Sequence, residues 1–174
     1  MAKRDLPEAA SYVEAGEGAR LFAPAAARNA APIIDLLSDI APEQGAALEL
    51  ASGTGQHIAA LAARLTGVSW QPSDVDPQRL ASINEHVSEA RLDNLAPAIA
   101  LDATVPGWGA VQAPRDLVLL VNLLHLISAA EAETLIREAA LALAPGGVFV
   151  IYGPFMRAGE LTSEGDREFH AKLS

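Results

Sequence analysis

Short apolar segments alternate with segments of helical periodicity along most of this chain. Short connections between strands and helices favour right-handed βαβ units, which build a mostly parallel sheet with helices on both faces. The 174 residues suffice for one ordinary domain. The alternation predicts a single doubly wound α/β domain over residues 25–174, preceded by a flexible or loosely docked arm over residues 1–24. The expected strands are residues 46–50, 68–72, 97–101, 116–121 and 148–152.

Local signals predict where two of the helices begin. Asp76 is expected to cap a helix whose first residue is Pro77, because an aspartate side chain accepts hydrogen bonds from the free N–H groups of a first turn. Ser128 and Glu131 have the spacing of a capping box. This pair predicts a helix that runs to about Leu143.

Prolines and glycines mark two further boundaries. The first helix is expected over residues 25–40, and Pro32 either kinks it or marks its true start, because proline cannot supply a helical N–H. The segment Ala144-Pro-Gly-Gly147 follows the last predicted helix. Its composition predicts a stop and a turn before the fifth strand.

The ends of the predicted strands carry glycines and polar side chains. Ligands of parallel α/β sheets bind beyond the carboxyl ends of the strands, near the switch in strand order. Gly53 and Gly55 allow a sharp turn that brings backbone N–H groups close to a ligand. Asp74 is placed to accept two hydrogen bonds from ribose hydroxyls, and Asp102 to accept one from the amine of adenine. The segments after the first four strands are Glu49-Leu-Ala-Ser-Gly-Thr-Gly-Gln-His57, Ser73-Asp74-Val75-Asp76-Pro77, Asp102-Ala103 and Asn122-Leu-Leu-His125.

The glycine loop does not have the pattern of a pyrophosphate site. A dinucleotide fingerprint places a third glycine three residues after Gly55, where this chain has Ile58. A phosphate-binding P-loop is excluded as well, because no Gly-Lys-Ser/Thr follows. The strand ends therefore indicate an adenosine-bearing ligand without a pyrophosphate.

The segment Glu49-x-Ala51-x-Gly53-x-Gly55 resembles the first motif of class I S-adenosylmethionine-dependent methyltransferases, with Ala51 in the first glycine place. The extra methyl group is tolerable there if the backbone keeps a negative φ. The resemblance implies a Rossmann-like sheet and S-adenosylmethionine as cofactor. The Gly53–Gly55 loop would pass under the methionine part, Asp74 would hold the ribose, and Asp102 would contact adenine. The expected cofactor-binding residues are Glu49, Ala51, Ser52, Gly53, Thr54, Gly55, His57, Asp74, Val75, Asp102, Ala103 and Asn122.

A narrower resemblance is to the domain-of-unknown-function 938 family, also called methyltransferase-like 26. It rests on motifs that together span residues 24–163, although it implies no particular substrate. These motifs are Pro24-Ala-Ala-Ala-Arg28-Asn29, Ala51-Ser-Gly-Thr-Gly-Gln-His57, Trp70-Gln-Pro-Ser-Asp74, Asn122-x-x-His125 and Tyr152-Gly-Pro-Phe155 with Thr162-Ser163.

The chain departs from the superfamily pattern after the fifth strand. Class I methyltransferases usually continue into a further helix and an antiparallel strand pair, which this sequence lacks. Either the sequence is incomplete, or the sheet has an open edge that a partner must cover.

Three residues are the candidates for the acceptor side: His125, Asn122 and Tyr152. His125 is the candidate general base, because an imidazole titrates near neutral pH, although a histidine in an apolar segment is often a core residue. Tyr152 either lines the acceptor pocket or packs in the core.

Other candidate residues also keep two interpretations. His57 either touches the ligand or has a capping or packing role. Asp102 either binds adenine or caps the turn after it. Arg28 and Asn29 either lie over the crevice as a lid or belong to a solvated arm.

Composition narrows the partners. A net charge of −10 disfavours nucleic acid, and no segment is apolar enough to cross a membrane. The absence of cysteine excludes disulfides and thiolate chemistry, and the four histidines lack metal-ligand spacing, so no metal is expected. We expect a cytoplasmic protein with a small-molecule acceptor, and a homodimer is one possible assembly.

Three functions remain for the structure to test. The first is methyl transfer from S-adenosylmethionine to a small molecule. The second is a non-catalytic S-adenosylmethionine-binding or scaffold subunit of a larger assembly. The third is a nicotinamide-dependent oxidoreductase, which the missing third glycine disfavours.

Overall fold

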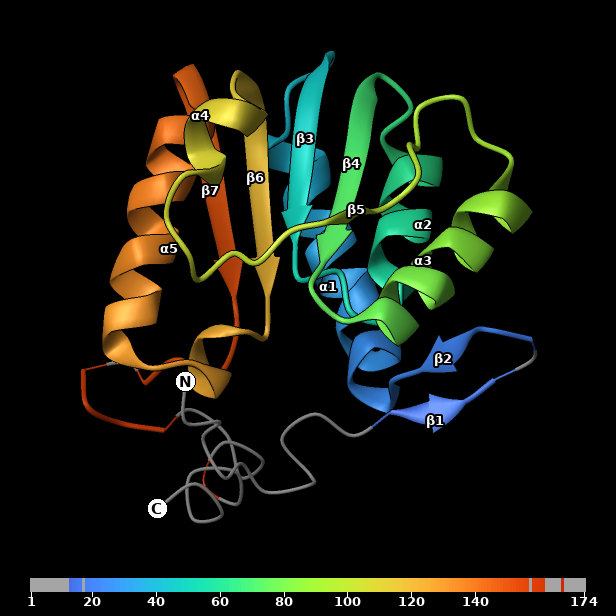
Figure 1. Cartoon of the computed structure of the whole chain (residues 1–174), viewed down its shortest axis with the longest axis horizontal. Helices are drawn as coiled ribbons and strands as arrows, with labels where there is room; N and C mark the ends of the chain where they lie inside the picture. Colours follow the sequence, from blue (N-terminus) through green and yellow to red (C-terminus); the bar gives the residue numbers. More distant parts are fainter. Residues whose placement is uncertain (1–12, 17, 157, 162–166, 168–174) are drawn as a thin grey trace.

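A five-stranded sheet forms the centre of the molecule (Figure 1). The computed structural model describes residues 13–16, 18–156, 158–161 and 167. The strand order is β5-β4-β3-β6-β7, and all four pairings are parallel. This arrangement confirms the doubly wound α/β prediction. The strands are β3 (Gly45–Leu50), β4 (Val68–Asp74), β5 (Ile99–Ala100), β6 (Arg115–Val121) and β7 (Leu143–Tyr152).

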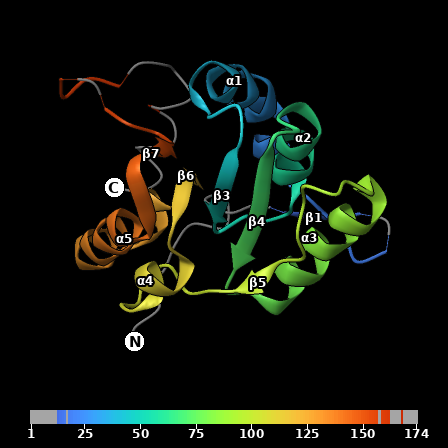
Figure 2. The same cartoon turned by 90° about the horizontal axis from the view of Figure 1, so that it is seen from above.

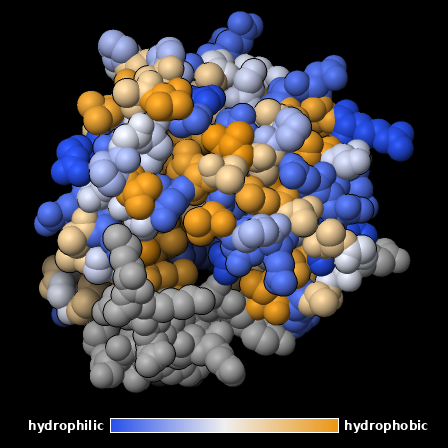
Figure 3. Space-filling view, viewed as in Figure 1, coloured by the Kyte–Doolittle hydropathy of each residue, from blue (hydrophilic) through white to orange (hydrophobic). Residues whose placement is uncertain are grey.

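Helices cover both faces of this sheet (Figure 2). One face packs against α1 (Pro24–Ile40), α2 (Gln56–Arg64) and α3 (Pro77–Ala90). The other packs against α4 (Trp108–Gln112) and α5 (Ala129–Ala142). Alternate residues of each strand point to opposite faces, so each face has its own buried apolar cluster. Figure 3 shows apolar residues across the middle of the α4 and α5 face, where the segment from β5 to α4 crosses the sheet.

The strand order reverses between β3 and β6. The chain runs outward from β3 to β4 and β5, and then returns to the other side of β3 with β6. The reversal separates the loops that leave the carboxyl ends of β3 and β6. Such a switch point is where doubly wound sheets bind their ligands.

A small antiparallel hairpin precedes α1. It consists of β1 (Glu14–Ala15) and β2 (Leu21–Phe22), which the sequence pattern did not indicate because each strand has two residues. The remainder of the predicted arm, residues 1–12, lies outside the described residues.

The predicted helix caps are confirmed. The Asp76 side chain accepts hydrogen bonds from the backbone N–H groups of Gln78 and Arg79, at 2.7 and 3.1 Å. Ser128 and Glu131 form the capping box, and their helix ends at Ala142. Both signals were readable because a cap is made by residues within one turn of each other.

Pro32 does not mark the start of the first helix, and the turn predicted at residues 144–147 was wrong. The α1 helix begins at Pro24 and runs through Pro32, whose ring lies on the exposed side, where water can satisfy the carbonyl that the proline leaves free. Ala144-Pro-Gly-Gly147 is part of β7 and not a turn before it. The pairing with β6 shifts there, so the four residues form a bulge in the strand.

Candidate functional site

The loop between β3 and α2 is the centre of the candidate site. Gly53 and Gly55 have φ values of 60° and 87°, which glycine adopts without strain. The Ser52 N–H donates to the Ser73 carbonyl at 2.8 Å, and the Gly55 N–H donates to the Ser52 carbonyl at 3.1 Å. The loop thus turns sharply while staying tied to the neighbouring strand β4.

The two glycines serve different purposes. A Cβ on Gly53 would meet only the Ala51 carbonyl oxygen, at 4.0 Å, so the space above it is open. A Cβ on Gly55 would lie 2.9 Å from the Ile83 Cα, which belongs to the α3 backbone and cannot move aside. Gly53 therefore leaves room for a ligand, whereas Gly55 lets α3 approach the loop.

This difference predicts unequal effects of alanine. We expect Gly53→Ala to lower the free energy of unfolding by about 1 kcal/mol, from the positive φ alone. Gly55→Ala should lower it by about 2 kcal/mol or more, because a clash with α3 is added. Urea unfolding of both variants measures the difference. Equal losses would show that the close approach of α3 has no energetic weight.

Ala51 does not meet the condition stated for it. Its φ is 51°, so the residue in the first glycine place of the motif adopts the left-handed conformation. An L-residue there is strained by about 1–2 kcal/mol. The substitution of alanine for glycine is therefore accommodated by strain, and not by a change of backbone.

Ala51→Gly should relieve that strain. Glycine loses about 0.5–1 kcal/mol through its greater freedom in the unfolded chain, so we expect a net gain of roughly 0.5 kcal/mol in the free energy of unfolding. Urea unfolding tests the sign. A loss of more than about 1 kcal/mol in the free energy of unfolding, which is the cost of glycine at an unstrained position, would contradict the strained conformation.

Asp74 fastens the loop to the end of β4. Its carboxylate is buried, and its Oδ2 accepts the Gly53 N–H at 2.9 Å. Its Oδ1 accepts the N–H groups of Val75 and Asp76, at 2.8 and 3.0 Å. A carboxylate has about four acceptor positions, so these three bonds leave room for about one more. Two hydrogen bonds to ribose were predicted at Asp74, and the protein's own N–H groups leave room for about one of them.

Glu49 is a buried acid near Asp74. Its side chain is 1% exposed, and its Oε2 has no hydrogen-bond partner among the described residues. Burial raises the pKa of Glu49 to about 8, against an opposing hydrogen bond to Ser52 and with a further rise from the charge of Asp74. A buried carboxyl with one oxygen left without a partner is costly unless it meets a ligand or stays protonated.

Three more predicted residues are buried around the same loop: Ser52, Thr54 and His57. The pKa of His57 is lowered by burial, and a hydrogen bond to the Ala26 backbone opposes the shift. Its Nε2 has no hydrogen-bond partner within the described part of the chain. The neutral imidazole thus connects the start of α2 with α1.

The segments after β4 and β5 complete the cofactor side. The Val75 side chain is 63% exposed. The Asp102 Oδ1 accepts the Thr104 N–H at 2.9 Å and the Thr104 hydroxyl at 2.6 Å, so Asp102 does cap the turn after it. Ala103 is buried, and its carbonyl accepts the indole N–H of Trp108 at 3.2 Å.

The candidates for the acceptor side follow β6 and end β7. The Asn122 N–H donates to the Tyr152 carbonyl at 2.8 Å, which brings these two residues together. Asn122 has a φ of 55°, a conformation that asparagine tolerates better than most residues. Tyr152 packs against the apolar cluster of the α1 face. His125 lies half-buried in the 3₁₀ turn η2 (Leu124–Leu126).

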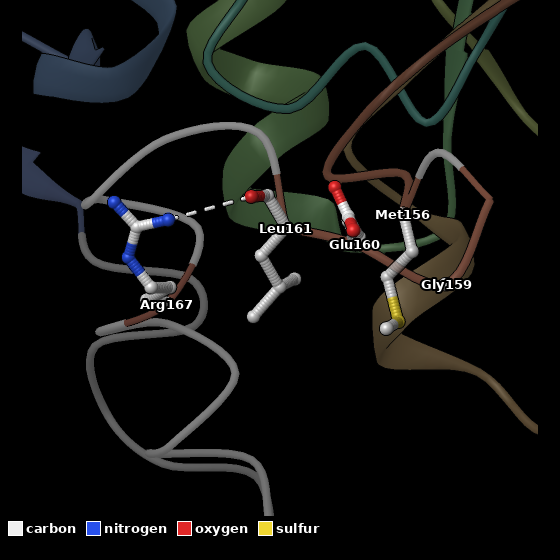
Figure 4. A pocket seen from close by; sticks show the side chains of 5 residues that line it. All are labelled: Met156, Gly159, Glu160, Leu161 and Arg167. Carbon is white, nitrogen blue, oxygen red and sulfur yellow. Dashed lines mark hydrogen bonds between the residues drawn. The ribbon is translucent and has the colours of Figure 1, made fainter.

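A hollow in the C-terminal segment does not belong to this site. It is lined by Met156, Gly159, Glu160, Leu161 and Arg167, none of which is a predicted site residue (Figure 4). Thr162 and Ser163, which carried part of the family resemblance, lie outside the described residues. Within the described residues, no group of three or more His, Cys, Asp or Glu side chains could hold a metal ion, and no helix is long and apolar enough to cross a membrane.

Sequence reasoning did not identify the polar side chains of α2 and α3 that form hydrogen bonds with the loop between β3 and α2. Ser82 is fully buried in α3, and its hydroxyl donates to the Thr54 carbonyl at 2.7 Å. Gln56 accepts the Thr54 hydroxyl at 2.9 Å. A polar residue inside the apolar stripe of α3 was the available signal for Ser82.

Comparison with known proteins identifies the family and the fold. The model of a family described as "Protein of unknown function (DUF938)" matches residues 20–174. A putative O-methyltransferase from Nostoc punctiforme is 22% identical, with a TM-score of 0.68, over 85% of this chain and 43% of that one. An O-methyltransferase family protein from Burkholderia thailandensis is also 22% identical, with a TM-score of 0.68, over 86% of this chain and 46% of that one.

A third similar structure carries a ligand. It is the glycopeptide N-methyltransferase MtfA complexed with S-adenosyl-L-methionine, 17% identical with a TM-score of 0.61, over 71% of this chain and 53% of that one. At these identities the likeness establishes the Rossmann-like fold of class I methyltransferases. The chain spans less than half the length of the first two structures.

Proposed function

The chain belongs to the DUF938 family, and from this premise we propose that it binds S-adenosylmethionine at the carboxyl edge of its sheet and transfers the methyl group to a small-molecule acceptor. The observation that carries the proposal is the pair of buried acids, Glu49 and Asp74, on either side of a glycine loop with open space above Gly53. The similar structures are methyltransferases, one of them complexed with this cofactor, which supports the same assignment.

The residues present fit the chemical groups of S-adenosylmethionine. The Oε2 atom of Glu49, which has no partner among the described residues, suits the cationic methionine end, and the remaining acceptor position of Asp74 suits a ribose hydroxyl. Asp102, Ala103 and the exposed Val75 would hold the adenine. Gly53 would allow the ligand to lie close to the backbone.

The cofactor supplies an activated methyl carbon, to which a lone pair of the acceptor forms a bond while the carbon–sulfur bond breaks and leaves its electron pair on sulfur. What the protein adds is position, because holding two reactants in line removes much of the entropic barrier. Asn122 and Tyr152 would orient the acceptor. His125 would take the proton that the acceptor releases.

The acceptor is proposed to be small and not a nucleic acid. A net charge of −10 repels phosphate backbones. The candidate side chains at the carboxyl edge are the amide of Asn122 and the imidazole of His125, which follow β6, and the phenol of Tyr152, which ends β7.

Calorimetric titration of the purified protein with S-adenosylmethionine and S-adenosylhomocysteine tests the cofactor, and reduced nicotinamide adenine dinucleotide is the control. We expect both adenosyl ligands to bind at micromolar concentrations and the dinucleotide not to bind. Binding of the dinucleotide alone would favour an oxidoreductase. Adenosyl binding without turnover in an acceptor screen would favour the non-catalytic subunit, and no binding at all would overturn the proposal.

A further inference from the structure

The glycine loop is connected to the N-terminal hairpin through Ser82. The Leu21 N–H of β2 donates to the Ser82 hydroxyl oxygen at 2.8 Å, and the same hydroxyl donates its proton to the Thr54 carbonyl at 2.7 Å. A serine inside a helix usually donates to a carbonyl of the preceding turn. Ser82 instead uses its only proton on the loop, and it is fully buried while doing so.

A second connection runs through Gln56, the first residue of α2. Its Oε1 accepts the Ala23 N–H at 2.7 Å and the Thr54 hydroxyl at 2.9 Å. The backbone carbonyl of Thr54 is therefore linked through Ser82 to β2. Its hydroxyl is linked through Gln56 to Ala23, between β2 and α1. Thr54 itself is buried between the two glycines whose φ values are positive.

The hairpin depends on these bonds for its position. Two strands of two residues each are not stable by themselves. The Phe22 side chain is 41% exposed and Leu21 is only half-buried, so the apolar side chains of β2 are incompletely buried. A further anchor is the ion pair between Arg20 and Glu89 of α3, at 2.8 Å, which lies partly in solvent and adds about 1 kcal/mol at most.

We propose that Ser82 and Gln56 are positioning residues that tie the N-terminal hairpin to the glycine loop, so that docking of the hairpin and binding of the adenosyl ligand stabilise each other. Asp74 holds the loop by accepting the Gly53 N–H. Ser82, which accepts the Leu21 N–H of the hairpin, holds the loop by donating to the Thr54 carbonyl. Coupling between two sites is reciprocal, so a ligand that orders the loop must also order residues 20–23. This inference rests on the proposed function.

Hydrogen exchange of single amides in the wild-type protein, measured by nuclear magnetic resonance, tests the coupling directly. Saturating S-adenosylhomocysteine should slow exchange at the Leu21 and Ala23 amides at least tenfold. The Ala113 amide, which bonds to Gly109 at the end of α4, serves as the reference for general stabilisation. Ligand binding that leaves the ratio of hairpin to reference exchange unchanged would overturn the inference.

Two variants separate positioning from stability. Ser82→Ala removes both relayed bonds and should weaken S-adenosylhomocysteine binding about tenfold. Ser38→Ala is the matched control, because Ser38 also lies in a helix but donates to the Ile34 carbonyl of its own helix, and its affinity should change less than twofold. Arg20→Ala, made outside the site, should weaken binding two- to threefold by loosening the hairpin. Unchanged affinity in both Ser82→Ala and Arg20→Ala would count against the coupling.

Failure of the proposed function gives a different result. If the wild-type protein binds no adenosyl ligand, the ligand assignment fails. The connection between the hairpin and the glycine loop can still be measured in the protein without ligand. Ser82→Ala and Arg20→Ala should then raise exchange at the Gly53 and Gly55 amides at least threefold over Ser38→Ala. No rise in the free protein would show that the hairpin does not position the loop.

Discussion

Asp74→Ala is expected to weaken binding of S-adenosylhomocysteine by about 1–3 kcal/mol and to lower the free energy of unfolding by about 2–4 kcal/mol. The substitution leaves the N–H groups of Gly53, Val75 and Asp76 without their acceptor. A buried donor left without a partner costs about 1–3 kcal/mol, and the partly exposed ones cost less because water replaces the carboxylate. Calorimetric titration and urea unfolding measure the two effects.

Asp76→Ala is the matched control for this prediction. It removes a carboxylate two residues away that caps α3 by accepting the N–H groups of Gln78 and Arg79. Losing a helix cap costs about 1 kcal/mol of stability. Ligand affinity should stay within threefold of the wild type, and an equal loss of affinity in both variants would show that only the fold, and not the Asp74 carboxylate, matters for binding.

Glu49→Gln is expected to make the protein more stable than the wild type, by an amount that grows between about pH 4.5 and pH 8. Burial raises the pKa of Glu49 from 4.5 to about 8, so the folded protein keeps this proton over a range in which the unfolded chain has lost it. Stability then falls as the pH rises, by up to about 1.4 kcal/mol per unit. Glutamine has the same shape and does not ionise, so the variant escapes this loss.

Urea unfolding at several pH values measures the stability difference between Glu49→Gln and the wild type. The difference should be near zero below pH 4.5 and level off above pH 8, at a plateau on the order of 5 kcal/mol. Every other titrating group is common to both proteins and cancels. A difference that does not change with pH would contradict the raised pKa.

Ligand binding offers a second measurement on the same residue. If the carboxylate meets the ammonium group of the ligand, Glu49 must give up its proton when the complex forms at pH 7. Titrations in buffers of different ionisation enthalpy should show close to one proton released by the wild type and none by Glu49→Gln. Equal proton release from both would place the ammonium away from Glu49.

Elements with local signals were predictable from the sequence. The caps at Asp76 and Ser128 depend on contacts within one helical turn, and the buried strand β6 is apolar along nearly its whole length. The polar residues after the strands were placed at one edge of the sheet because parallel strands end together. Short elements such as β1 and β2 escaped prediction, since two residues cannot show a period.

The alternation of apolar strands with helices was enough to predict the fold class. The glycine pattern, the acids that follow the strands and the absence of a third glycine predicted the candidate ligand. The pKa of the acids and their hydrogen-bond partners were decided by the tertiary structure alone. Burial raises the pKa of Glu49 to about 8, and Asp74 uses three of its acceptor positions for backbone N–H groups. Ser82 reaches a loop 28 residues away in the sequence. These properties arise because segments that are distant in the sequence pack together. The residues adjacent to a side chain in the sequence do not determine which distant segment will bury that side chain.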